Sequence, residues 1–142
     1  MAQGVAGRNA VVQLDNAAGS LTDVSAYVES LDFSTEIETY LTTTLGASAQ
    51  SRVVGLQDGN FSITFVYDRT GGVPTIYNHV TGIYGAAASK TFDIRPEGST
   101  AGYPKMTGEC NLKSFSLPIA VGDKLSITAQ FECTGPVTFG TV

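Results

Sequence analysis

Residues 31–43 alternate between two kinds of side chain without a break, and this pattern limits what the chain can fold into. The odd positions are Leu31, Phe33, Thr35, Ile37, Thr39, Leu41 and Thr43, and the even positions are Asp32, Ser34, Glu36, Glu38, Tyr40 and Thr42. Because successive side chains of a strand point to opposite faces, the alternation predicts one long strand with an apolar face and an acidic face. Residues 60–68 alternate in the same way, so the two segments predict a long antiparallel hairpin.

The connection between these strands, residues 42–59, is far longer than a hairpin turn, which needs about two to five residues. Long connections without structure of their own are usually functional or disordered. Thr, Ser, Gly and Ala dominate the first part of this one, and Arg52 is its one basic residue. A catalytic loop, a linker and a surface for another protein chain are the three interpretations to be separated.

The rest of the chain predicts a mainly β protein. Further strands are expected at 9–15, 90–96, 104–118 and 123–133, while 21–30 is ambiguous and could form a single helical turn capped by Asp23. Apolar residues at helical spacing predict one α-helix at about 74–85, with Pro74 in its first turn and Gly85 at its end. The expected fold is an antiparallel β-sandwich or barrel of about seven strands with this helix on its side.

Length and composition indicate how the chain is organised. Its 142 residues fit a single domain, 1–142, with an N-terminal arm (1–8) and an irregular C-terminal tail (134–142). Charged residues are only 15% of the chain, which is typical of a surface that packs against other chains. The N-terminus lacks the pattern of a signal peptide, and no apolar run approaches the length of a membrane span.

The charge argues against stable nucleic-acid binding. The net charge is −5, and the eight basic residues are scattered without a cluster. Binding to nucleic acid draws most of its affinity from basic groups that neutralise phosphates. Cys110 and Cys133 are too few for a disulfide framework and have no partners at metal-ligand spacing, so we expect two buried thiols. They face each other in one register of the last two strands, and their redox state is left open.

The sequence gives no support for catalysis or for a cofactor. Ser48 lies in GASAQ, one residue short of a nucleophile elbow, and its flanks predict strands where the elbow needs a strand and a helix. The one histidine, His79, lies on the predicted helix, with no sign of a nucleophile beside it. Asp32, Glu36 and Glu38 alternate along one strand about 7 Å apart, which gives a solvated acidic stripe in place of a cleft.

The order of these features resembles the major tail tube proteins of long-tailed bacteriophages. The resemblance rests on GLQDGNFSITF (55–65) and, much later, VGDKLSITAQFECTGPVT (121–138), and it covers about residues 9–139. It implies a non-enzymatic virion protein whose rings, usually hexameric, stack into a tail tube. Such a tube surrounds a tape-measure protein, meets tail terminator and tail tip proteins, conducts double-stranded DNA, and is assembled in the host bacterial cytoplasm.

With this resemblance, an assembly surface becomes the preferred interpretation of the 42–59 loop. The predicted contacts between subunits or rings are Thr43, Thr44, Leu45, Ser48, Gln50, Arg52, Val53 and Val54. The acidic residues predicted to face the lumen are Asp32, Glu36 and Glu38. Which strands line the lumen is left open, because the pair 104–118 and 123–133 suits that place equally well. The alternatives are a monomeric β-sandwich binding module and another phage assembly part, such as a head decoration or tail terminator protein.

Overall fold

A single seven-stranded antiparallel sheet forms the frame of the computed structural model, which describes residues 4, 6–69 and 72–142. The strands follow the order β2-β1-β5-β6-β7-β4-β3. Their bounds are β1 Val11–Asp15, β2 Leu21–Asp23, β3 Val28–Leu41, β4 Arg52–Val66, β5 Lys90–Arg95, β6 Pro104–Ser116 and β7 Ser126–Thr141. One α-helix, α1 (Thr75–Ile83), follows β4. The expected mainly β fold of about seven antiparallel strands with one flanking helix is therefore confirmed.

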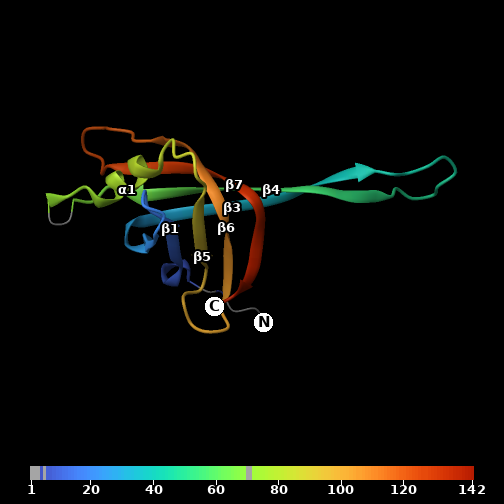
Figure 1. The fold of residues 1–142 in the computed structure, drawn as a ribbon, viewed down its shortest axis with the longest axis horizontal. Coiled ribbons are helices and arrows are strands. Elements are labelled where there is room, and N and C mark those ends of the chain that lie inside the picture. Colours follow the sequence, from blue (N-terminus) through green and yellow to red (C-terminus); the bar gives the residue numbers. More distant parts are fainter. Residues whose placement is uncertain (1–3, 5, 70–71) are drawn as a thin grey trace.

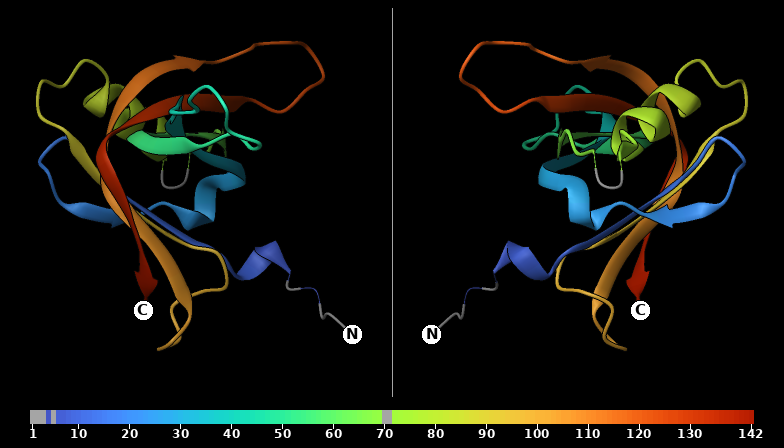
Figure 2. Two further views of the ribbon diagram at one scale, coloured as in Figure 1. Left: turned by 90° about the vertical axis from the view of Figure 1, so that its right-hand side faces the viewer. Right: turned by 90° about the vertical axis from the view of Figure 1, so that its left-hand side faces the viewer.

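The sheet rolls up until strands that are distant in its order touch. Phe92 on β5 and Phe33 on β3 are separated by β6, β7 and β4, which would place them about 19 Å apart in a flat sheet. Their ring centroids are instead 6.2 Å apart. Figure 2, viewed along the long axis of the molecule, shows the strands curving around this interior. The sheet is thus an incomplete barrel, with β2 and β3 as its two edges.

Aromatic rings fill the centre of this roll. The Phe61 ring stacks on Phe131 of the neighbouring strand, with centroids 4.7 Å apart, and lies 4.9 Å from Phe92 across the interior. Phe33 completes the group at 6.1 Å from Phe61. The odd positions of β3 and β4 near the body therefore supply the core, as the alternation predicts.

The helix closes one end of the roll. Its buried side chains are Ile76, Val80 and Ile83, which belong to the same core cluster as the phenylalanines. Tyr84, directly after the helix, meets Phe115 of β6 edge-on, with centroids 5.2 Å apart. The apolar stripe expected from helical spacing is therefore the buried face of α1.

The C-terminal segment differs from the expectation, because residues 134–141 are not irregular but continue β7. Gly135 and Pro136 are residues of the kinds that often interrupt a strand. Gly135 adopts a positive φ of 82°, and a register shift in β6–β7 lies beside it. Residues 135–137 have no register partner on β6 between the pairs Glu109↔Thr134 and Thr107↔Thr138, so Pro136 lies within a bulge, one of the places where a sheet tolerates proline.

The ambiguous segment 21–30 contains the expected single helical turn and also a short strand that was not expected. Residues Leu21–Asp23 form β2, and a single 3-10 turn follows at Ser25–Tyr27. The Asp23 carboxylate accepts a hydrogen bond of 2.9 Å from the Ser25 N–H, and the Val12 N–H donates to the Ser25 hydroxyl at 2.8 Å. Of the expected N-terminal arm 1–8, residues 1–3 and 5 lie outside the described residues, and a 3-10 turn spans Gly7–Asn9.

We expect the largest loss of stability from a single substitution at Phe61, whose ring lies at the centre of the aromatic core. Replacing Phe61 with Ala removes contacts to Phe33, Phe92 and Phe131, and we expect it to lower the free energy of unfolding by about 3–5 kcal/mol. Phe61→Leu, which keeps most of the volume, should cost clearly less. Urea denaturation of the unassembled subunit measures both, and equal losses for the two variants would contradict a packing role for the ring.

Candidate assembly surfaces

The hairpin of β3 and β4 leaves the body of the molecule and forms a projecting arm. β4 pairs with β7 only from Asn60↔Glu132 to Val66↔Ser126, whereas its pairing with β3 continues out to Leu41↔Arg52. Residues 35–41 and 52–59 therefore form a ribbon of two strands, which with the connection 42–51 we call the arm (Figure 1). A two-stranded ribbon is at best marginally stable alone in water, so the arm is a natural place for another chain to bind.

The connection at the end of the arm is shorter than the sequence predicts. The expected loop 42–59 is wrong in its second half, because β4 begins at Arg52 and the irregular part is 42–51. Gly55 and Gly59 interrupt the apolar alternation there, which hid the strand. The sequence signal that remained was Val53 and Val54, two β-branched residues in succession.

Hydrogen bonds between the two ends of the 42–51 connection confine its irregular part to the residues near the tip. The Thr42 N–H donates to the Ser51 carbonyl at 2.8 Å, and the Ser51 N–H donates to the Thr43 hydroxyl at 2.8 Å. Within the tip, the Ala47 N–H donates to the Thr44 carbonyl at 3.2 Å, and Leu45 projects with its side chain fully exposed. The predicted contact residues Thr43, Thr44 and Leu45 therefore shape or present the tip.

The other predicted contact residues divide between the tip and the strand. Ser48 and Gln50 lie exposed in the connection, and the Arg52 guanidinium donates to the Gln50 side-chain oxygen at 2.7 Å. Val53 and Val54 lie on successive positions of β4 and so point to opposite faces.

The face of β3 and β4 that supplies the core continues along the arm, where its apolar side chains are exposed to solvent. Beyond Phe33 and Phe61, the residues on this face include Ile37, Leu41 and Val54, all exposed. We call these three side chains the apolar arm face. Residues of this kind are normally buried, and a row of them on a projecting ribbon indicates an interaction surface. Our sequence interpretation considered contacts in the loop alone and did not single out Ile37 and Leu41 as exposed apolar residues, although the alternation itself marks them.

The opposite face of the arm is mixed and also apolar near its end. Tyr40 and Leu56 are exposed there, with Leu56 at 76%. The Tyr40 ring lies over Gly55, where a Cβ would collide with it. Its hydroxyl donates to Glu38 at 2.6 Å, and this hydrogen bond raises the pKa of Tyr40. Tyr40 thus covers the backbone at a bulge in the ribbon, a use of tyrosine that the sequence pattern did not predict.

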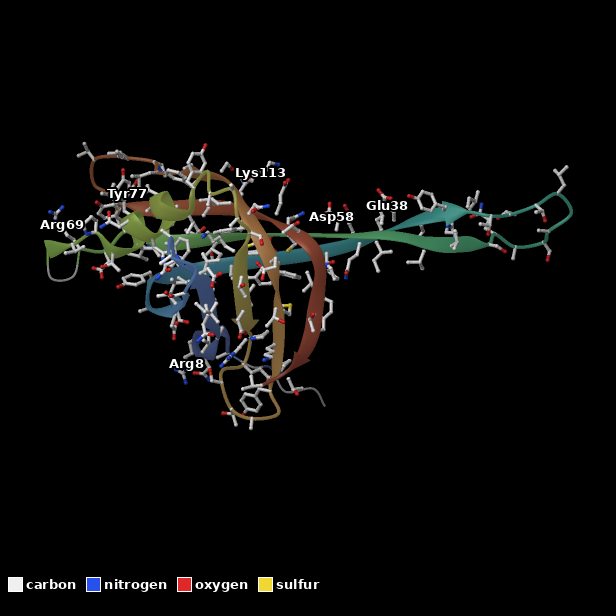
Figure 3. All side chains as sticks on the ribbon, in the orientation of Figure 1. Arg8, Glu38, Asp58, Arg69, Tyr77 and Lys113 are labelled. Atoms are coloured by element: carbon white, nitrogen blue, oxygen red, sulfur yellow. The ribbon has the colours of Figure 1, made fainter. Side chains whose placement is uncertain are left out.

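Nearer the body, this second face becomes polar and acidic. Asp32 lies opposite Ser62, and Glu36 lies opposite Asp58. Glu132 of β7 extends the face and pairs with Lys113 of β6 at 3.3 Å. A shallow cleft of about 330 Å³ on the face is lined by Asp32, Ser34, Asn60, Phe61, Ser62, Lys113, Gln130, Phe131 and Glu132. We call this surface the acidic face; Figure 3 shows Glu38 and Asp58 on the arm and Lys113 where the arm meets the body.

The groups that a catalytic interpretation would need are not brought together. Ser48 lies in the arm connection, while His79 lies on α1 at the other end of the molecule (Figure 1). Desolvation lowers the pKa of His79, which favours its neutral form. Within the described residues, no cluster of three His, Cys, Asp or Glu side chains could hold a metal ion. None of the helices in that part of the chain is long and apolar enough to cross a membrane.

The fold resembles solved structures of tail and tube assemblies over the whole chain. A chain from the virion of a native gene transfer agent particle matches 98% of this chain and 99% of its own length, with a TM-score of 0.73 and 16% sequence identity. A chain from the tail of an empty gene transfer agent particle, with C6 symmetry, matches with a TM-score of 0.71 and 15% identity over 98% of this chain and 99% of its own. The SPP1 tail tube matches with a TM-score of 0.74 and 12% identity over 98% of this chain and 80% of its own.

The chain therefore has the fold of phage tail tube proteins, which confirms the fold that the sequence resemblance implies. The likeness lies in the fold, because sequence identity is low throughout. No protein-family model matches the chain. Comparison with curated protein sequences finds no significant relative.

We expect repulsion between carboxylates of the acidic face to lower the stability of the arm by a measurable amount. Like charges directly opposite each other destabilise a strand pair, so we expect Asp58→Asn to stabilise the ribbon by about 0.2–1 kcal/mol by relieving its repulsion with Glu36. At low salt, amide hydrogen exchange at residues 35–41 and 52–58 should be slower in the Asp58→Asn variant than in the wild-type chain. The gain should shrink at high salt because exposed charges are screened; an equal gain at all salt concentrations would contradict the electrostatic cause.

Proposed function

We propose that this chain is the subunit of a phage-type tail tube and assembles with copies of itself into rings that stack. The observation that carries the proposal is the arm, a ribbon with exposed apolar side chains on a fold that it shares with the SPP1 tail tube. The apolar arm face of Ile37, Leu41 and Val54 is suited to packing against another copy. Burial of apolar surface is the main driving force of such association.

The free edge of the sheet supports assembly independently of the arm's side chains. Among the residues that the structure describes, β3 is the last strand of the sheet, and none of them forms a strand on the outer side of Val28–Leu41. A long exposed edge is a template for pairing with another chain, and closed structures remove it. A ring in which each subunit covers the β3 edge of its neighbour would satisfy these backbone groups.

The asymmetry of the contact is also compatible with a ring. The arm projects on one side of the body, so an arm that binds the body of the next copy makes a head-to-tail contact, which closes a ring or continues as a helix. The C6 symmetry of the gene transfer agent tail supports six subunits per ring. In this arrangement Thr43, Thr44, Leu45, Ser48, Gln50, Arg52, Val53 and Val54 would contact a neighbouring subunit or ring.

The acidic face is the surface best suited to line a lumen. Asp32, Glu36 and Glu38 share it with Asp58 and Glu132, and Lys113 is held by Glu132. Such a surface repels phosphates and releases no counterions on contact, so double-stranded DNA would slide past it without binding. We further propose a tape-measure protein, tail terminator and tail tip proteins as partners. The location would be the virion tail, assembled in the host cytoplasm, with no catalytic role.

A monomeric binding module is the less favoured alternative. Its platform would need the aromatic side chains of Tyr40, Tyr67 and Tyr103, which lie on the arm, after β4 and before β6, respectively. They are therefore distributed over separate elements, whereas a carbohydrate site needs them on one surface. In the part of the chain that the structure describes, no feature favours a head decoration or tail terminator role over a tube subunit.

The apolar arm face provides the first test. Ile37→Thr, Leu41→Thr and Val54→Thr together should leave a folded subunit, because the three side chains are exposed and Thr keeps the preference for strands. Tube formation followed by negative-stain electron microscopy should be lost. As a matched control, Ile37→Val, Leu41→Ile and Val54→Ile keep the face apolar and should still form tubes. Tubes from the threonine variant would contradict the role given to this face.

The acidic face provides the second test. Asp32→Lys, Glu36→Lys and Glu38→Lys together should leave tubes intact and slow the passage of DNA, because the new cations attract phosphates. The matched control replaces the same three residues by Gln or Asn, which removes charge without adding attraction. Particles that carry the lysine variant and eject their genome at the normal rate would show that this face does not line the lumen.

A further inference from the structure

Cys110 and Cys133 lie directly opposite each other on β6 and β7, and both are free thiols. This register was left open by the sequence and is now fixed by the strand pairing. Opposed residues of an antiparallel pair have Cα atoms about 4.5 or 5.5 Å apart, depending on the local hydrogen-bond pattern. Both separations fall within the range of about 4.4–6.8 Å that a disulfide spans. The backbone therefore already places the two residues for a bond.

The surroundings leave room for the sulfur atoms on the core side of the sheet. Directly opposed residues point to the same face, and Cys110 is completely buried in the core cluster. Gly59 of β4 lies beside Cys133, and a Cβ at that position would be 3.3 Å from the Cys133 Sγ. The absence of a side chain at Gly59 accommodates the sulfur. The pair thus lies where the arm leaves the sheet, next to the last β4–β7 pair, Asn60↔Glu132.

The two thiols differ in how easily a reagent can reach them. Cys133 is only partly buried, whereas no part of Cys110 is accessible. Burial raises the pKa of Cys133, with a further rise from the nearby charge of Asp58. Burial also raises the pKa of Cys110, with smaller contributions from Cys133, Glu109 and Asp15. Both groups are therefore protonated thiols at neutral pH, so oxidation of the folded chain should be slow.

We propose that Cys110 and Cys133 are an oxidation site that closes to an intramolecular disulfide by exchange with a small-molecule disulfide, Cys133 reacting first. Cys133 loses its proton and attacks one sulfur of the reagent, whose S–S bond breaks and releases one thiolate. Cys110 then loses its proton and attacks the Cys133 sulfur of this mixed disulfide, which releases the second thiolate. The two protein thiols lose two electrons in total, and the reagent gains them and the two protons as it becomes two thiols.

The disulfide would link β6 covalently to β7 at the point where the arm leaves the sheet. It closes the chain from 110 to 133 into a covalent loop, which restricts the unfolded state and so stabilises the folded one. It also joins two strands that both carry register shifts close to this pair. The proposal concerns the single subunit and does not depend on the proposed tube.

Intact mass measurement of the purified full chain tests the proposal. After long incubation with oxidised glutathione at mildly alkaline pH, denaturation and alkylation, the protein should have lost two hydrogens and should take up no alkylating reagent. It should run as a monomer on a non-reducing gel, and its thermal midpoint should rise and return to the original value with dithiothreitol. Retention of both thiols, disulfide-linked dimers as the main product, or a lowered midpoint would each overturn the proposal.

Two single variants test the order of the reaction. Cys110→Ser should stop at the mixed disulfide and carry one glutathione, because the second thiol is missing. Cys133→Ser should remain unmodified in the folded state, because Cys110 is inaccessible, and should react once unfolded in urea. Equal rates of glutathione uptake by the two folded variants would contradict the order, independently of whether the wild-type disulfide forms.

Discussion

The point at which β4 stops pairing with β7 determines most of what distinguishes this molecule. From Asn60 inward, β4 lies between two strands and its apolar side chains enter the aromatic core. From Gly59 outward it pairs with β3 alone, and the same kind of side chains face solvent. The alternation of β3 does not change at this point. One continuous pattern therefore builds a core at one end and an exposed apolar surface at the other.

The two faces of these strands have separate consequences for assembly. On one face, the apolar residues would gain by burial against another copy, and the unpaired β3 edge adds backbone groups to the same requirement. On the other face, Glu36 and Asp58 repel each other, a cost that the isolated subunit bears without a visible structural benefit. A surface kept acidic at the expense of stability fits contact with a polyanion that must not bind. The tail tube proposal accounts for both faces together.

The sequence predicted the elements better than their ends. Strict alternation in 31–43 and helical spacing in 74–85 identified β3 and α1, because core burial imposes those periods. The start of β4 was missed because Gly55 and Gly59 interrupt the pattern, although the Tyr40 ring covers one and the Cys133 sulfur lies against the other. The end of β7 was missed because Gly135 and Pro136 resemble a turn, while in the structure they form a bulge and the pairing of β7 with β6 continues beyond them. Both errors depend on tertiary neighbours that local sequence does not contain, and the same is true of the opposition of Glu36 and Asp58.

Electron microscopy of the purified wild-type chain over a range of concentrations tests the central claim most directly. The account predicts hollow tubes of stacked rings, with six-fold symmetry in projection as in the gene transfer agent tail, the arm of each subunit buried against another copy, and the acidic face toward the lumen. A chain that stays monomeric at the highest concentration reached, or tubes in which the arm remains free in solvent, would contradict it.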